Sequence, residues 1–142
     1  MIGVEELVKK ANLEVETWSV ERVEKAQADH EIVVVDIRDI RELAREGRVP
    51  GAVHAPRGML EFWVDPTSPY HREVFAQNDK TYVFFCAAAW RSALAAKSMQ
   101  DMGFGPVAHM EGGFANWREL GKPVELADPK NIRPDKSSSK TD

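Results

Sequence analysis

Cysteine is nearly absent from this chain: the 142 residues contain one, Cys86. A single cysteine excludes a disulfide within the chain, fits a reducing compartment and removes any cysteine-rich metal site. Basic clusters are also lacking and the formal net charge is −4, so nothing favours binding to nucleic acid. No apolar run approaches the ~20 residues of a membrane span. The start of the chain carries acids where a signal peptide is basic and then apolar, and we therefore expect a cytoplasmic protein.

The composition is that of an ordinary globular protein, with 43% hydrophobic and 30% charged residues. A chain of this length is expected to form one domain with a sizeable core. We divide it into an N-terminal helix and lead-in over residues 1–18, the main domain over 19–126, and a polar tail over 127–142 that is predicted to be disordered.

Hydrophobic patterns that are typical of helices and of strands alternate along the chain. Helices are expected from residue 4 onward and near 19–29, 38–46, 93–102 and 114–120, and strands near 31–37, 52–55, 82–85 and 107–110. The segment 59–77 is expected to be irregular, with one helical turn near 73–76. This alternation predicts an α/β fold with a mainly parallel sheet, in which functional sites lie beyond the carboxyl ends of the strands.

Cys86 lies between the apolar run 82–85, a predicted buried strand, and a predicted helix. It is therefore placed at a strand-to-helix turn, where free backbone N–H groups and the positive end of the helix dipole converge. Such surroundings favour a thiolate over a thiol, and the thiolate is the competent nucleophile. The loop that begins at Cys86 is accordingly expected to carry the chemistry.

This loop belongs to an ordered set of four segments. They are 35–38 (Val-Asp-Ile-Arg), 47–54 (Gly-Arg-Val-Pro-Gly-Ala-Val-His), 86–92 (Cys-Ala-Ala-Ala-Trp-Arg-Ser) and 110–117 (Met-Glu-Gly-Gly-Phe-Ala-Asn-Trp). In order and spacing the set resembles the single-domain rhodanese-like (sulfurtransferase) family. The resemblance implies a three-layer α/β domain with a mainly parallel, five-stranded sheet flanked by helices.

The resemblance also implies an activity. Cys86 would take a sulfane sulfur from a donor, either thiosulfate or a persulfide, hold it as a persulfide, and pass it to a thiophilic acceptor. Neither a metal nor an organic cofactor is needed, and the persulfide is a covalent intermediate. The partners are then a small-molecule or protein sulfur donor and acceptor.

The backbone N–H groups of the loop are expected to form an anion cradle around the sulfur. The residues of this cradle are Ala87, Ala88, Ala89, Trp90 and Arg91. We expect Arg91 to hold the loop by pairing with an acid such as Glu111, with some contact to the substrate.

Three further residues are expected to support the loop, because they follow neighbouring strands: Asp36, Arg38 and Arg57. Asp36 and Arg38 match the Asp-x-Arg of the family, and a structural role is favoured for Asp36, while the role of Arg38 stays open. Arg57 is either a second cationic contact for the substrate or a solvated surface arginine.

Loop length separates sulfur transfer from a related chemistry. Arg91 is the sixth residue counted from Cys86, whereas cysteine phosphatases and the related arsenate reductases have one residue more, in a ring wide enough for a tetrahedral oxyanion. The position one further on is Ser92, which cannot neutralise a phosphate. The shorter loop favours sulfur transfer, and a phosphatase or arsenate reductase is the alternative.

The loop departs from the family by carrying alanines where glycine and basic or polar residues are common. A positive φ is strained in alanine, and an apolar loop attracts a doubly charged anion such as thiosulfate less strongly. A further alternative is a non-catalytic docking module that uses the aromatic cluster of Phe62, Trp63, Tyr70 and His71. For Phe62 and Trp63 we expect packing in the core instead.

Overall fold

Five parallel strands form the central sheet of the computed structural model, which describes residues 1–132. The strands are β1 (Glu16–Trp18), β2 (Ile32–Asp36), β3 (Val53–His54), β4 (Thr81–Phe85) and β5 (Val107–Met110), in the spatial order β1-β5-β4-β2-β3. β4 is the middle strand and pairs with β2 and β5 on its two sides. The prediction of a five-stranded parallel sheet is confirmed.

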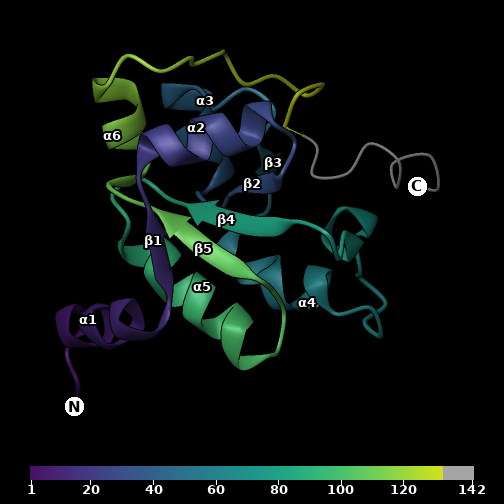
Figure 1. The fold of residues 1–142 in the computed structure, drawn as a ribbon. Helices are drawn as coiled ribbons and strands as arrows, with labels where there is room; N and C mark the ends of the chain where they lie inside the picture. Colours follow the sequence, from purple (N-terminus) through teal and green to yellow (C-terminus); the bar gives the residue numbers. More distant parts are fainter. Residues whose placement is uncertain (133–142) are drawn as a thin grey trace.

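Helices cover both faces of this sheet, as Figure 1 shows. They are α1 (Val4–Glu14), α2 (Val20–Ala28), α3 (Ile40–Glu46), α4 (Leu60–Val64), α5 (Trp90–Asp101) and α6 (Gly113–Glu119), with 3₁₀ turns at Arg57–Met59 and Glu73–Ala76. In the view of Figure 1, α2, α3 and α6 lie above the sheet, and α1, α4 and α5 lie below it. The three-layer α/β architecture is therefore confirmed.

Alternation along the strands builds two apolar clusters, one on each face of the sheet. In β2, Val33 and Val35 belong to the cluster under α5, while Ile32 and Val34 belong to the cluster under α2. All five residues of β2 are buried, as expected for a continuous β-branched run inside a parallel sheet. Cys86 continues the alternation of β4 and lies on the α5 side.

Helix starts follow local capping chemistry. The Ser19 side chain accepts a hydrogen bond from the N–H group of Arg22 at the start of α2. Asp39 and Glu42 form a capping box at the start of α3, and Gly47 closes that helix with a φ of 88°. These signals are local in sequence, which explains why both helices were predicted correctly.

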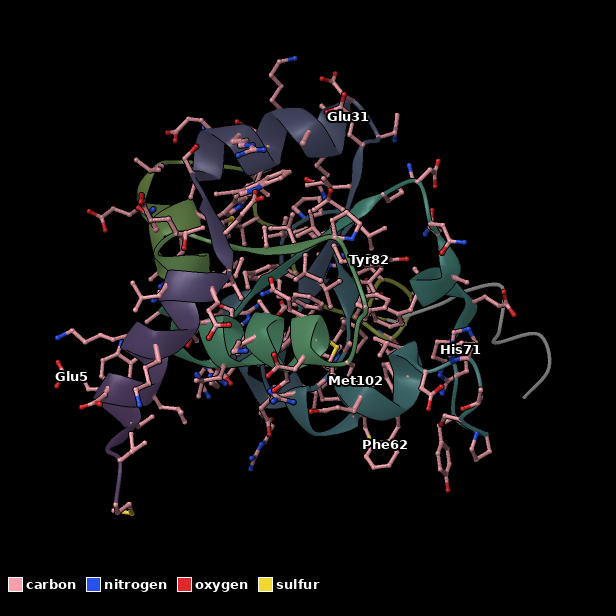
Figure 2. All side chains as sticks on the ribbon, turned by 60° about the horizontal axis from the view of Figure 1, so that its bottom comes forward. Glu5, Glu31, Phe62, His71, Tyr82 and Met102 are labelled. Carbon is pink, nitrogen blue, oxygen red and sulfur yellow. The ribbon has the colours of Figure 1, made fainter. Side chains whose placement is uncertain are left out.

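The segment 59–77 differs from its prediction in two ways. It contains the short helix α4 in addition to the expected turn at residues 73–76. The core prediction for Phe62 is wrong, because its side chain is 51% exposed and meets Tyr70 edge to face. Figure 2 shows the labelled Phe62 ring at the edge of the molecule, pointing away from the fold. Trp63, next in sequence, turns the other way and packs against the α5-side cluster.

The end of the described chain is a turn, in which Asp128 accepts hydrogen bonds from the N–H groups of Lys130 and Asn131. The predicted disorder of residues 133–142 concerns a segment outside the described residues. Within residues 1–132 no helix is long and apolar enough to cross a membrane.

Candidate active site

The carboxyl ends of β2, β3 and β4 meet at one edge of the sheet. The N–H group of Ile37 donates to the carbonyl of Phe85 at 3.0 Å, and the N–H group of Ala55 donates to the carbonyl of Asp36 at 2.9 Å. The three segments expected to build the site, at 36–38, 54–57 and 86–92, therefore come together.

Cys86 is buried at the centre of this edge, with 1% of its surface exposed. Its Sγ accepts hydrogen bonds from the backbone N–H groups of Ala89, at 3.2 Å, and Ser92, at 3.3 Å. The sulfur thus lies at the amino end of α5, where two N–H dipoles and the helix dipole stabilise negative charge on it.

The loop backbone contains one strained residue. Ala89 has a φ of 80° and a ψ of 1°, the left-handed conformation, immediately before α5 begins. This conformation costs an L-residue with a Cβ roughly 1–2 kcal/mol. Residues in such conformations concentrate at functional sites, where the surrounding structure holds them. Trp90 follows on the rim of the loop, with 49% of its surface exposed.

The first turn of α6 holds the other side of the loop. The N–H group of Phe114 donates to the carbonyl of Cys86 at 2.8 Å, and that of Ala115 donates to the carbonyl of Ala87 at 3.1 Å. A Cβ on Gly113 would lie 2.4 Å from the Cys86 carbonyl oxygen, so only glycine allows this close approach. The two carbonyls are directed to α6, and the loop N–H groups remain available to the sulfur.

Arg91 pairs with Glu42 of α3 and not with Glu111. Its Nη1 and Nη2 donate to the two carboxylate oxygens at 2.8 and 3.0 Å. This hydrogen-bonded pair raises the pKa of Arg91, to which the nearby Cys86 also contributes, and lowers the pKa of Glu42. Arg91 therefore ties the loop to α3 while its charge stays close to the sulfur.

Asp36 and Arg38 form a buried ion pair beside the loop. Arg38 Nη2 donates to Asp36 Oδ2 at 2.8 Å and to the Gly47 carbonyl at 2.9 Å, and its guanidinium stacks on Phe114 at 4.1 Å from the ring centre. Both side chains are almost fully inaccessible to solvent. They link the end of β2 to α3 and α6, the two helices that hold the Cys86 loop.

Arg57 is directed away from the loop. Its guanidinium donates to both carboxylate oxygens of Glu61, at 3.0 and 3.1 Å, and to Ser98 Oγ at 3.1 Å. Ser98 follows Ser92 by six residues in α5, about 9 Å along the helix axis. The structure therefore places Arg91 close to Cys86 and the Asp36–Arg38 pair at the neighbouring strand end. It leaves the Arg57 side chain about 1.7 helical turns away from the loop.

Two buried residues behind the sulfur were given no role in the chemistry from the sequence: Ser92 and His109. Ser92 Oγ lies 3.6 Å from Cys86 Sγ and 3.0 Å from His109 Nδ1. Burial lowers the pKa of His109 to about 4, so the imidazole is neutral at pH 7. A histidine at an inward position of a buried strand was the available signal, because such a polar group requires partners.

No group of three or more histidine, cysteine, aspartate or glutamate side chains among residues 1–132 has the arrangement of a metal site. A cavity of about 510 Å³ lies on the α2 side and is lined by Gln27, Pro50 and Trp117 among others. Its lining includes no residue of the Cys86 loop, so this cavity is separate from the site.

The model of the rhodanese-like domain family matches residues 19–120, and the chain belongs to this family. The putative sulfurtransferase YtwF of Bacillus subtilis is 36% identical over 100 residues, which cover 70% of this chain and 86% of that protein. The family and this relative support a sulfurtransferase activity in general terms.

Two solved structures extend the comparison. The polysulfide-sulfur transferase of Wolinella succinogenes, a homodimer, superposes with a TM-score of 0.66 and 29% identity, covering 88% of each chain. A protein of unknown function from Rhodopseudomonas palustris, named as a "Possible Tyrosine Phosphatase", has a TM-score of 0.83 and 48% identity, covering 88% of this chain and 96% of that one. The phosphatase alternative therefore has to be weighed against the geometry of the loop.

Proposed function

We propose that this protein moves sulfane sulfur from a donor to a thiophilic acceptor through a persulfide on Cys86. The observation that carries the proposal is the position of the sulfur. The one cysteine of the chain is buried at the start of a helix, with two backbone N–H groups donating to its Sγ. These groups favour the anionic forms of both the thiol and the persulfide.

The cycle has two steps. The Cys86 thiolate attacks the outer sulfur of the donor, the bond from Sγ to that sulfur forms, and the sulfur–sulfur bond of the donor breaks. The bonding pair leaves with the donor remnant, a thiolate or sulfite. The acceptor then attacks the outer sulfur and the Cys86 thiolate is released. The charge at the loop is negative throughout, so one fixed array of N–H groups serves both steps.

The loop favours a persulfide donor over thiosulfate. Residues Ala87 to Ala89 offer only backbone polarity, and the cation that follows them in the loop, Arg91, is paired with Glu42. A doubly charged anion therefore meets little net positive charge, whereas a persulfide brings a smaller charge and an apolar body. Activity with thiosulfate is expected but slow.

The geometry argues against a phosphatase or an arsenate reductase. The loop has one residue fewer than the ring that encloses a tetrahedral oxyanion, and the Arg91 guanidinium is committed to both oxygens of Glu42. A phosphate in the loop would lack the bidentate arginine contact that such anions require. Measurable turnover of an aryl phosphate by the wild-type protein, lost in Cys86→Ser, would revive this alternative.

Intact-mass spectrometry tests the proposal. The purified protein is treated with a low-molecular-weight organic persulfide or with thiosulfate, and then with cyanide. We expect a gain of one sulfur atom, its loss to cyanide as thiocyanate, and a higher rate with the persulfide. Cys86→Ser is the matched control, because it keeps the size of the side chain and a hydroxyl but removes the sulfur.

A folded Cys86→Ser protein that still transferred sulfur would overturn the mechanism. The absence of any adduct on the wild-type protein with both donors would favour the docking module, for which the exposed rings of Phe62, Tyr70 and Trp90 are the candidate surface. We further propose a cytoplasmic protein that needs no metal or organic cofactor.

A further inference from the structure

A chain of hydrogen bonds runs from the catalytic sulfur to the surface on the α1 side. Cys86 Sγ lies 3.6 Å from Ser92 Oγ, which lies 3.0 Å from His109 Nδ1. The other ring nitrogen, His109 Nε2, lies 2.8 Å from Asn12 Oδ1 and 3.1 Å from Thr17 Oγ1. Ser92 and His109 are buried, whereas Asn12 and Thr17 are exposed. This series of hydrogen bonds thus connects the buried thiol to solvent.

His109 occupies a position where the strand pattern calls for an apolar side chain. Its neighbours Ala108 and Met110 belong to the cluster under α2, and Val107, two residues before it, belongs to the cluster under α5. His109 therefore faces α5 and α1 from inside the fold, with 1% of its surface exposed. A buried imidazole is tolerated only when its nitrogen atoms have partners, and both have them here.

The partners fix the direction of the hydrogen bonds. Asn12 Oδ1 is a carbonyl oxygen and only accepts, so His109 Nε2 carries the proton and donates to it. His109 is neutral, and Nδ1 is then the acceptor for the Ser92 hydroxyl. The lone pairs of Ser92 Oγ are left to accept from the Cys86 thiol. The Cys86 thiol, the Ser92 hydroxyl and the His109 imidazole are thereby oriented to carry a proton away from the sulfur.

We propose that Ser92 and His109, anchored by Asn12, form a relay that removes the thiol proton of Cys86 and then directs the Ser92 hydroxyl at the resulting thiolate. The inference rests on the proposed function, in which Cys86 reacts as a thiolate. Asn12 lies in α1, outside residues 19–120 that match the family, so the N-terminal segment contributes to the active site.

The proton balance of the relay is closed. The thiol proton moves to Ser92 Oγ as the hydroxyl proton of Ser92 moves to His109 Nδ1. The imidazolium then releases its Nε2 proton to water at the surface, and the exposed Asn12 amide rotates its oxygen away. The bare Nε2 accepts from the Thr17 hydroxyl, whose Oγ1 lies 3.1 Å away. Because the pKa of His109 is about 4, the cation does not persist at neutral pH. The result is a thiolate that accepts three hydrogen bonds, from the Ala89 and Ser92 N–H groups and from the Ser92 hydroxyl.

The charged groups around the sulfur act independently of this relay. Arg91 of α5 is paired with Glu42 of α3, and Asp36 is paired with Arg38 at the end of β2. The first turn of α6 brings no charged side chain, and the hydrogen-bond partners of His109 from α1, β1 and α5 are all uncharged. A change at His109 therefore alters the proton path without removing a charge from the loop.

Alkylation of Cys86 by iodoacetamide, followed by intact mass between pH 5 and 10, tests the relay without any sulfur donor. Ser92→Ala removes only a hydroxyl and His109→Leu removes the imidazole. Ser92→Ala thereby removes one hydrogen bond to the thiolate, and His109→Leu removes the group that orients the Ser92 hydroxyl. In both variants we expect the alkylation rate at pH 7 to fall about tenfold. The rates should converge with the wild-type rate at high pH, where the thiol ionises unaided.

Two further variants sharpen the test: the single variant Asn12→Ala, and the double variant that combines Ser92→Ala with His109→Leu. Asn12→Ala should shift the profile in the same direction by a smaller amount, and the double variant should equal Ser92→Ala, because the residues act as one chain. His71→Leu is the matched control, because His71 hydrogen-bonds the Trp63 carbonyl and is not a member of the relay. Its pH profile of alkylation should equal that of the wild-type protein.

An unchanged pH profile in folded Ser92→Ala would overturn the relay, and so would additive effects in the double variant. Thermal unfolding of each variant separates these outcomes from a failure to fold. Failure of the proposed function has a different signature. The wild-type protein would still be alkylated faster at pH 7 than Ser92→Ala and His109→Leu, but it would gain no sulfur from either donor.

Discussion

The ends of β2 and β4 lie side by side, and each carries buried groups that can take part in chemistry. They differ in how many hydrogen-bond partners the protein itself gives to these groups. At the end of β2, Asp36 binds Arg38 through both of its carboxylate oxygens. Arg38 also binds the Gly47 carbonyl and packs on Phe114. After β4, the Cys86 sulfur accepts only two backbone hydrogen bonds, and the loop around it contains a left-handed alanine.

The difference separates a group that holds the fold from a group that we propose to react. The Asp36–Arg38 pair satisfies most of its hydrogen-bonding capacity internally and is closed to solvent on both sides. The Cys86 loop directs two backbone N–H groups at the sulfur, and the left-handed Ala89 is held in place by its surroundings. Proximity at the edge of the sheet therefore does not by itself assign a catalytic role.

The largest effect on stability is expected from Asp36→Asn. The variant keeps the shape of the side chain but leaves the buried charge of Arg38 without its counter-ion, which costs about 3 kcal/mol of the free energy of unfolding. Urea unfolding at pH 7 measures the change. Asp29→Asn is the control, because Asp29 forms an exposed pair with Lys25 and should cost little. Equal costs in the two variants would contradict a structural role for the Asp36–Arg38 pair.

A smaller effect on stability, with a larger effect on activity, is expected from Gly113→Ala. The new Cβ would displace the carbonyls of Cys86 and Ala87, so we expect a loss of about 2 kcal/mol from overpacking and backbone strain. Sulfur transfer should fall about a hundredfold, as for a misplaced reacting group. Gly121→Ala is the control: its φ is also positive, but no atom lies within 4 Å of the added Cβ. It should lose about 1 kcal/mol and no activity.

The smallest effect is expected from Glu42→Gln, and it depends on pH. Because Arg91 lowers the pKa of Glu42 below its ordinary value of 4.5, the pair stabilises the folded state at pH values above 4.5. This stabilisation is lost as the pH falls through the lowered folded-state value. The variant should lose about 0.5 kcal/mol at pH 7, and the difference from the wild-type protein should disappear in acid. A difference that grew below pH 4.5 would contradict the pairing.

The parts of the fold that were predicted correctly depend on short sequence signals. The β-branched run of β2, the cap at Ser19 and the glycine at 47 each act within a few residues, and the loop after Phe85 is contiguous in the chain. The parts that were missed depend on neighbours that are distant in sequence. β1 has three residues and exists through its pairing with β5, and Phe62 differs from Trp63 only in which side of α4 meets the core.

The candidate site follows the same rule. Cys86 and its loop were identified because they are local, while the contact from Asn12 to His109 spans 97 positions and requires β1 and β5 to lie side by side. The partner of Arg91 was likewise not predictable, because Glu42 reaches it across 49 positions from the start of α3.

The burial of Cys86 has a consequence for the two forms of the proposed carrier. In the resting form Cys86 has 1% of its surface exposed, so a bulky molecule in solution has almost no access to it. Addition of a second sulfur lengthens the side chain by one S–S bond, about 2.05 Å. The transferable atom then stands at the mouth of the loop while the atom that bears it stays enclosed. In the proposed cycle a large acceptor can therefore reach the outer sulfur of the persulfide, but it cannot reach the Cys86 sulfur once that outer atom has been transferred.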